Sequence, residues 1–180
     1  MTARADVLAA NLDVVRRRIA AACAEAGRPE GDVSLVVVTK FFPASDVRLL
    51  ADLGVTDVGE NRHQEAEVKA AECADLGLRW HFIGGLQSNK AAAVAAYADV
   101  VESVDRAKLV APLSRGAHSR GHEVDVLLQV SLDPPGADHR SGADPDDLAE
   151  GRDGHQTAQS EQAGLHDATC QVGEVVGVST

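Results

Sequence analysis

Aromatic residues are scarce in this sequence, and so are basic ones. Aromatic side chains make up 3% of the 180 residues, which argues against a protein that stacks nucleic-acid bases. The 17 basic and 28 acidic residues give a net charge of −11 without a basic cluster, so the chain repels phosphate backbones overall. We therefore expect no nucleic-acid partner.

Cysteines and long apolar segments are also few. The three cysteines, Cys23, Cys73 and Cys170, are widely spaced and form no C-x-x-C pair, which favours reduced thiols over a disulfide framework or a zinc site. No segment approaches the roughly 20 apolar residues of a membrane span, and the first residues, MTARAD, contain no apolar signal core. The sequence predicts a soluble, cytoplasmic protein that has no membrane contact.

The apolar residues that are present alternate between short strands and helices. After an amphipathic helix over 8–19, each short apolar run leads into a helical pattern. The expected strands cover 35–38, 55–59, 79–84, 99–104 and 123–132. This succession predicts an α/β fold of βα units around a parallel sheet. Neither a G-x-G-x-x-G fingerprint nor a P-loop follows a strand, and the pattern leaves a (β/α) barrel and an open doubly wound sheet as alternatives.

Polar side chains collect where the expected strands end, which is the edge where both of these folds carry their active sites. The run Leu35–Val38 predicts a strand buried on both faces, with Lys40 at its end and Pro43 opening the next helix. A lysine held by a rigid apolar strand is a candidate nucleophile towards aldehydes. A solvated lysine at a strand end is the alternative.

Four segments carry a family resemblance, and they occur in the order VVVTKFFPA (36–44), GENRHQE (59–65), WHFIGGLQSNK (80–90) and VESVDR (101–106). They resemble the pyridoxal-phosphate homeostasis proteins, single-domain relatives of the N-terminal barrel of alanine racemase. The resemblance covers about the first 150 residues. It implies a (β/α)8 TIM barrel that holds pyridoxal 5′-phosphate (PLP) as a Schiff base on Lys40. It also implies a monomer that regulates vitamin B6 pools without established turnover.

The same resemblance supplies the other expected cofactor-binding residues. Asn61 lies beside the cofactor by analogy, although a residue before a helix also suits an N-cap. His81 is expected on the strand face opposite Trp80, either at the site or away from it. Ser88 is a loop contact or the start of a helix. We expect no catalytic residue and no metal ligand.

Two further functions are alternatives. A PLP-dependent amino-acid racemase would need a second acid or base, typically a tyrosine, and the one tyrosine, Tyr97, lies in an alanine-rich helical segment. His118 and His122 have the spacing of metal ligands on a helix, but Gly116 and Gly121 predict a loop there.

The sequence departs from the family pattern in places, most of all at its end. Phe42 and Arg140 stand where the family often has lysines, and the loops that cradle the phosphate in the family are not recognisable here. In 151–170, Leu165 is the one large aliphatic residue. We therefore expect 1–148 to form the first five or six βα units of a barrel, with an open edge prone to association. Residues 149–180 are expected to be a poorly ordered tail outside the family.

Overall fold

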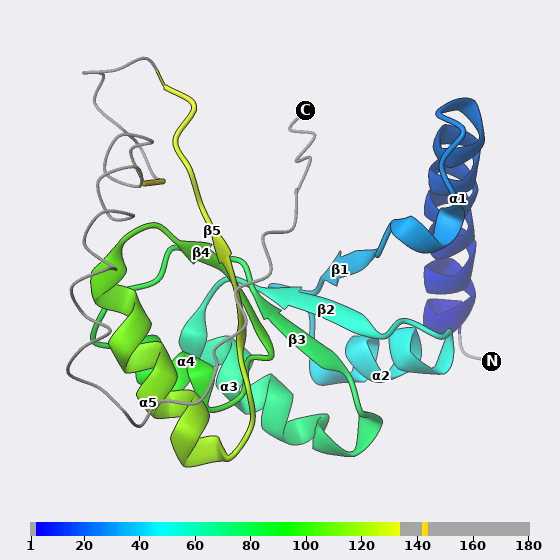
Figure 1. Ribbon diagram of the computed structural model, residues 1–180. Helices are drawn as coiled ribbons and strands as arrows, with labels where there is room; N and C mark the ends of the chain where they lie inside the picture. Colours follow the sequence, from blue (N-terminus) through cyan, green and yellow to red (C-terminus); the bar gives the residue numbers. More distant parts are fainter. Residues whose placement is uncertain (1–2, 134–141, 144–180) are drawn as a thin grey trace. The chain divides into compact units, whose positions relative to one another are not determined.

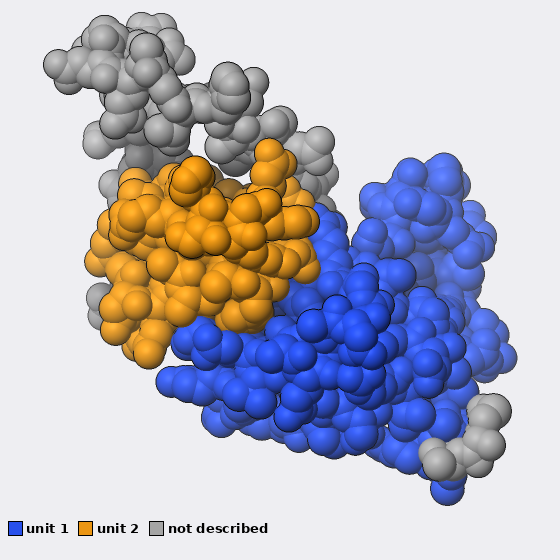
Figure 2. All heavy atoms as spheres, turned by 90° about the horizontal axis from the view of Figure 1, so that it is seen from below, with its two compact units in different colours: residues 1–81 blue, residues 82–180 orange. Residues whose placement is uncertain are grey.

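The computed structural model describes residues 3–133 and 142–143, so the expected tail, 149–180, lies outside the described residues. The chain forms two compact units, one of residues 1–81 and the other of residues 82–180, shown in separate colours in Figure 2. Among the described helices, none is long and apolar enough to cross a membrane.

Helices and strands alternate along both units (Figure 1). The first unit contains α1 (Ala3–Glu25), β1 (Val36–Val38), α2 (Ala44–Asp52), β2 (Asp57–Glu60), α3 (His63–Glu72) and most of β3 (Arg79–Phe82), with 3-10 turns η1 (Glu30–Asp32) and η2 (Ala74–Leu76). The second unit contains α4 (Ala91–Ala95), β4 (Val100–Val104), η3 (Ala107–Leu109), α5 (Val110–Arg120) and β5 (Asp125–Leu128).

The strands pair in parallel. In the first unit, Val36 pairs with Asp57 and Val38 with Gly59. In the second unit, β4 pairs with β5, and the register shifts between Val101 and Val104. The strand order β1-β2-β3-β4-β5 is the order of the chain, whereas a doubly wound sheet reverses its order at a switch point. The α/β fold with the strand succession of a TIM barrel is confirmed, and the sheet is not closed within the described residues.

Two predictions about the strands differ from the structure by more than one or two residues at a strand end. The fifth strand, predicted over 123–132, spans only Asp125–Leu128, and an isolated bridge joins Val130 to Ala143 beyond it. The prediction that the first strand is buried on both faces is wrong, because Val38 is 44% exposed and the other two residues of β1 are half-buried. Among the described residues β1 is an edge strand that pairs with β2 only, and a short apolar run does not reveal what covers the edge and the faces of a strand.

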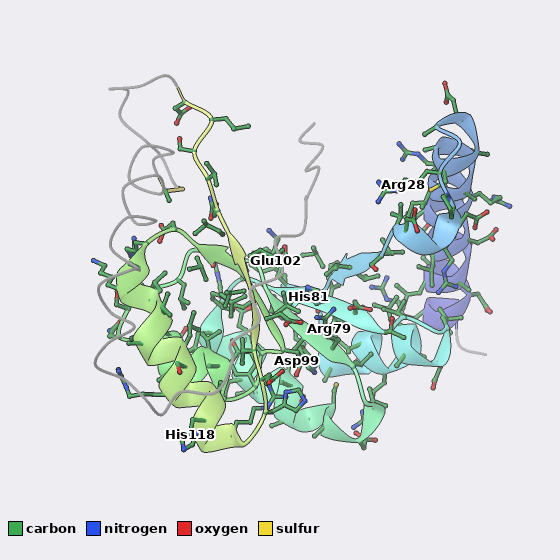
Figure 3. All side chains as sticks on the ribbon, viewed as in Figure 1. Arg28, Arg79, His81, Asp99, Glu102 and His118 are labelled. Atoms are coloured by element: carbon green, nitrogen blue, oxygen red, sulfur yellow. The ribbon has the colours of Figure 1, made fainter. Side chains whose placement is uncertain are left out.

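The loop predicted around Gly116 is wrong as well, because α5 continues to Arg120. A Cβ atom on Gly116 would lie 2.3 Å from the carbonyl oxygen of Ala92 in α4, so the missing side chain lets the two helices approach closely. Gly121 ends α5 at φ 70°, the left-handed conformation of a helix-terminating glycine. His118 therefore lies on the last turn of a helix (Figure 3). The described residues contain no group of three metal-ligating side chains.

Candidate functional site

Lys40 lies in a tight turn directly after β1. The Phe42 N–H donates a hydrogen bond to the Thr39 carbonyl oxygen at 3.1 Å, which closes the turn around Lys40 and Phe41. Phe41 has a φ of 70°, a conformation that turns usually assign to glycine or asparagine at this position. Holding a bulky residue there costs roughly 1–3 kcal/mol, and such strain concentrates at functional sites.

The Lys40 side chain is half-buried, and its ammonium group lies 5.9 Å from the centre of the Phe41 ring. The Arg62 guanidinium lies over the same ring at 5.1 Å. Within the described part of the chain, the Lys40 amine has no carboxylate partner. It is therefore a lysine whose amino group is not committed to an ion pair and remains available to a ligand.

A buried network beneath this turn was not anticipated from the sequence. The Thr39 hydroxyl donates to Glu60 Oε1 at 2.6 Å, and Lys69 donates to the same oxygen and, at 2.9 Å, to the Thr39 carbonyl. Glu60 is 0% exposed and Lys69 is 7% exposed. The signal that was missed is the position of Lys69 on α3, where it shares the buried stripe with Ala66 and Ala70. A lysine on a buried stripe requires an acidic partner.

Asn61 follows the end of β2, as Lys40 follows the end of the neighbouring strand β1. Its Oδ1 atom is buried and has no hydrogen-bond partner among the described residues, and the same is true of Glu60 Oε2. A buried acceptor without a donor costs roughly 1–3 kcal/mol, so this position favours a ligand that donates a hydrogen bond. The alternative role of Asn61 as an N-cap is not realised, because Arg62 occupies that position of α3.

His81 pairs with Asp57 within the first unit (Figure 3 labels His81). The Nε2 atom of His81 lies 3.0 Å from Asp57 Oδ1. Burial acts to raise the pKa of Asp57, but hydrogen bonds from Thr56 and His81, with the charges of His81 and Arg79, outweigh it and hold the pKa below its ordinary value. Side chains alternate along β2, so Asp57 lies on the face opposite Glu60 and α3.

The depressed pKa of Asp57 predicts a loss of stability in acid. Its folded-state pKa lies below the unfolded value, so the stabilisation is present above about pH 4 and disappears as the pH falls through the folded-state pKa. We expect Asp57→Asn to lower the free energy of unfolding at neutral pH by about 1–2 kcal/mol and to flatten its decline in acid. Urea titrations at several pH values measure this, with the exposed Asp52→Asn as the control. Identical pH profiles for Asp57→Asn and the unsubstituted protein would contradict the prediction.

Ser88 belongs to the second unit, where it is half-buried in the turn before α4. Arg106 anchors the preceding loop, because its Nη2 atom donates to the Leu86 carbonyl at 2.8 Å. At the end of β4, Ser103 Oγ and Asp105 Oδ1 are buried without a hydrogen-bond partner among the described residues. The structure thus places Lys40, Asn61 and His81 in the first unit and leaves further unpaired polar atoms at a strand end of the second.

Several curated proteins are similar to this chain in sequence. The pyridoxal phosphate homeostasis protein of Mycobacterium tuberculosis is 43% identical over 149 residues, which cover 74% of this chain and 57% of that protein. The protein of the same name from Pseudomonas aeruginosa is 43% identical over 141 residues, covering 78% of this chain and 60% of that one. The chain therefore spans little more than half the length of these relatives. No protein-family model matches it.

Solved structures show the same relationship. PipY of Synechococcus elongatus PCC7942, in a structure with PLP bound, is 33% identical with a TM-score of 0.63, and the match covers 91% of this chain and 72% of that one. A protein from Bifidobacterium adolescentis is 36% identical with a TM-score of 0.71, covering 83% and 64% of the two chains. This chain belongs to the family of the pyridoxal phosphate homeostasis proteins.

Proposed function

We propose that this protein binds PLP as a Schiff base on Lys40 and takes part in intracellular PLP homeostasis. The observation that carries the proposal is the amine of the half-buried Lys40, which has no carboxylate partner among the described residues and follows β1 in a strained turn. The names of the relatives and the PLP-bound PipY structure support the same cofactor.

The described residues around Lys40 fit the aldehyde end of this cofactor. PLP supplies an aldehyde, and its condensation with a neutral lysine amine forms a C=N bond and releases water. Lys40 supplies the amine, and the unpaired Asn61 Oδ1 offers a hydrogen-bond acceptor after the adjacent strand. We include His81, oriented by Asp57, as a further cofactor contact in the first unit, and Ser88 is proposed as a cofactor contact from the sequence resemblance alone.

Replacing Lys40 tests the proposal. We expect PLP to give the unsubstituted protein a near-visible absorbance band and, after borohydride reduction, a modified peptide that contains residue 40. Lys40→Ala should lose both signals, because it removes the amine. Lys108→Ala is the matched control, since Lys108 is exposed and lies in the second unit. Undiminished labelling of Lys40→Ala would refute the assignment.

We further propose that the protein is a cytoplasmic monomer without a nucleic-acid partner, which is in keeping with its net charge of −11. The part proposed to carry the cofactor is 1–148.

Exposed strand edges favour self-association of proteins, and β1 with the exposed Val38 is such an edge within the described residues. Sedimentation over a range of concentrations distinguishes a monomer from a self-associating chain.

A further inference from the structure

Lys69 is a buried cation that the proposed cofactor chemistry does not use. Charge compensation explains one of its hydrogen bonds, the one to the Glu60 carboxylate. The other is donated to the backbone carbonyl of Thr39 at 2.9 Å. That carbonyl belongs to the peptide unit that joins Thr39 to Lys40, so α3 acts directly on the backbone of the proposed cofactor lysine.

Thr39 is fixed at each of its polar groups. Its N–H donates to the Gly59 carbonyl at 2.9 Å, its hydroxyl donates to Glu60, and its carbonyl accepts from Lys69 and from the Phe42 N–H. The peptide unit is planar, so a fixed Thr39 carbonyl also fixes the direction of the Lys40 N–H. The direction of the Lys40 N–H relative to β1 is thereby set by the groups that hydrogen-bond to Thr39.

The strained turn makes this fixation necessary. Phe41 is held at a φ of 70°, which a bulky side chain disfavours. Opening of the turn, which breaks the bond between the Phe42 N–H and the Thr39 carbonyl, is one route by which Phe41 can relax to a negative φ. A charge-assisted hydrogen bond from Lys69 to the same carbonyl opposes that movement.

We propose that Lys69 is a positioning residue for Lys40: its ammonium group fixes the Thr39–Lys40 peptide plane and so maintains the strained turn that presents the Lys40 amine to an aldehyde. This inference rests on the proposed function, in which Lys40 carries PLP. It assigns no contact with the cofactor to Lys69.

The test compares Lys69→Met with the double variant Lys69→Met/Glu60→Gln. For each folded protein, the measurements are the urea midpoint and the ratio of borohydride-trapped PLP on Lys40 to that on the exposed Lys108, at sub-saturating PLP. We expect Lys69→Met to lower the midpoint and to reduce the labelling ratio about tenfold, the size of effect expected for one charge-assisted hydrogen bond. In the double variant no unpaired buried carboxylate remains, so the midpoint should recover while the ratio stays low.

Recovery of the labelling ratio together with the midpoint would show that Lys69 only stabilises the unit, and an unchanged ratio in Lys69→Met would also overturn the inference. Equal labelling of Lys40 and Lys108 in the unsubstituted protein would instead refute the proposed function. In that case, hydrogen exchange of the backbone amides tests the role of Lys69 independently of PLP. The Phe42 amide should exchange about tenfold faster in the double variant, relative to the Val55 amide, which donates to Leu50 in the same unit. Unchanged Phe42 exchange would refute the role of Lys69.

Discussion

Glu60→Ala is expected to destabilise the first unit by about 3–5 kcal/mol, because it leaves the ammonium group of Lys69 buried without a counter-charge. It also removes the acceptor of the Thr39 hydroxyl, which lies 2.6 Å from Glu60 Oε1. The measurement is urea unfolding followed by the fluorescence of Trp80, the only tryptophan of the sequence, which is 5% exposed in β3.

Two further variants identify the cause of this loss. Glu67→Ala on the exposed side of α3 should change stability by less than about 0.5 kcal/mol. Glu60→Gln retains an acceptor for Thr39 but not the negative charge, so its stability should lie between those of Glu60→Ala and the unsubstituted protein. A loss below about 1 kcal/mol for Glu60→Ala would mean that Lys69 is not confined to the buried position described here.

Gly116→Val is expected to destabilise the second unit by about 3 kcal/mol, at the upper end of the cost of overpacking. The new Cβ would lie 2.3 Å from the Ala92 carbonyl oxygen and 2.7 Å from the Ala95 Cβ, so α4 and α5 would have to separate. Thermal unfolding followed by circular dichroism measures the loss, and Ser114→Ala on the exposed face of α5 is the control.

Gly116→Ala provides the critical comparison, because two effects act in opposite directions. Alanine in place of glycine within a helix favours folding by about 1 kcal/mol. The contact with Ala92 disfavours it by more, so the net effect should be a loss of stability. An alanine variant at least as stable as the unsubstituted protein would contradict close packing of α4 against α5.

The succession of strands and helices could be predicted because it depends on local sequence periodicity. The wrong predictions concern positions whose structure is determined by residues far away in the sequence. Gly116 has the appearance of a helix breaker in the sequence, yet it is a contact point whose partner, Ala92, is remote in the chain. The burial of β1 depends on which elements cover its faces and its free edge, which its three valines do not encode.

The candidate site was predictable to a similar extent. Lys40 and Asn61 are candidate site residues because strand ends of parallel sheets carry functional residues, and because both lie in family motifs. The positive φ of Phe41 has no local signature, since the sequence offers no glycine there. Lys69 was missed because a lysine on a helix is usually exposed, and only its spacing with Ala66 and Ala70 indicates burial.

The network around Thr39 has a consequence for the time at which the lysine becomes reactive during synthesis. Its hydrogen bonds join residues that are only 21 and 30 positions apart, and the last contributor is Lys69. Contacts between residues close in sequence form early in folding, and proteins fold from the N-terminus as they are translated. The turn that presents Lys40 can therefore be assembled on the ribosome once α3 has emerged, before β4 and β5 have left the exit tunnel. An aldehyde would then meet a prepared amine on a nascent chain.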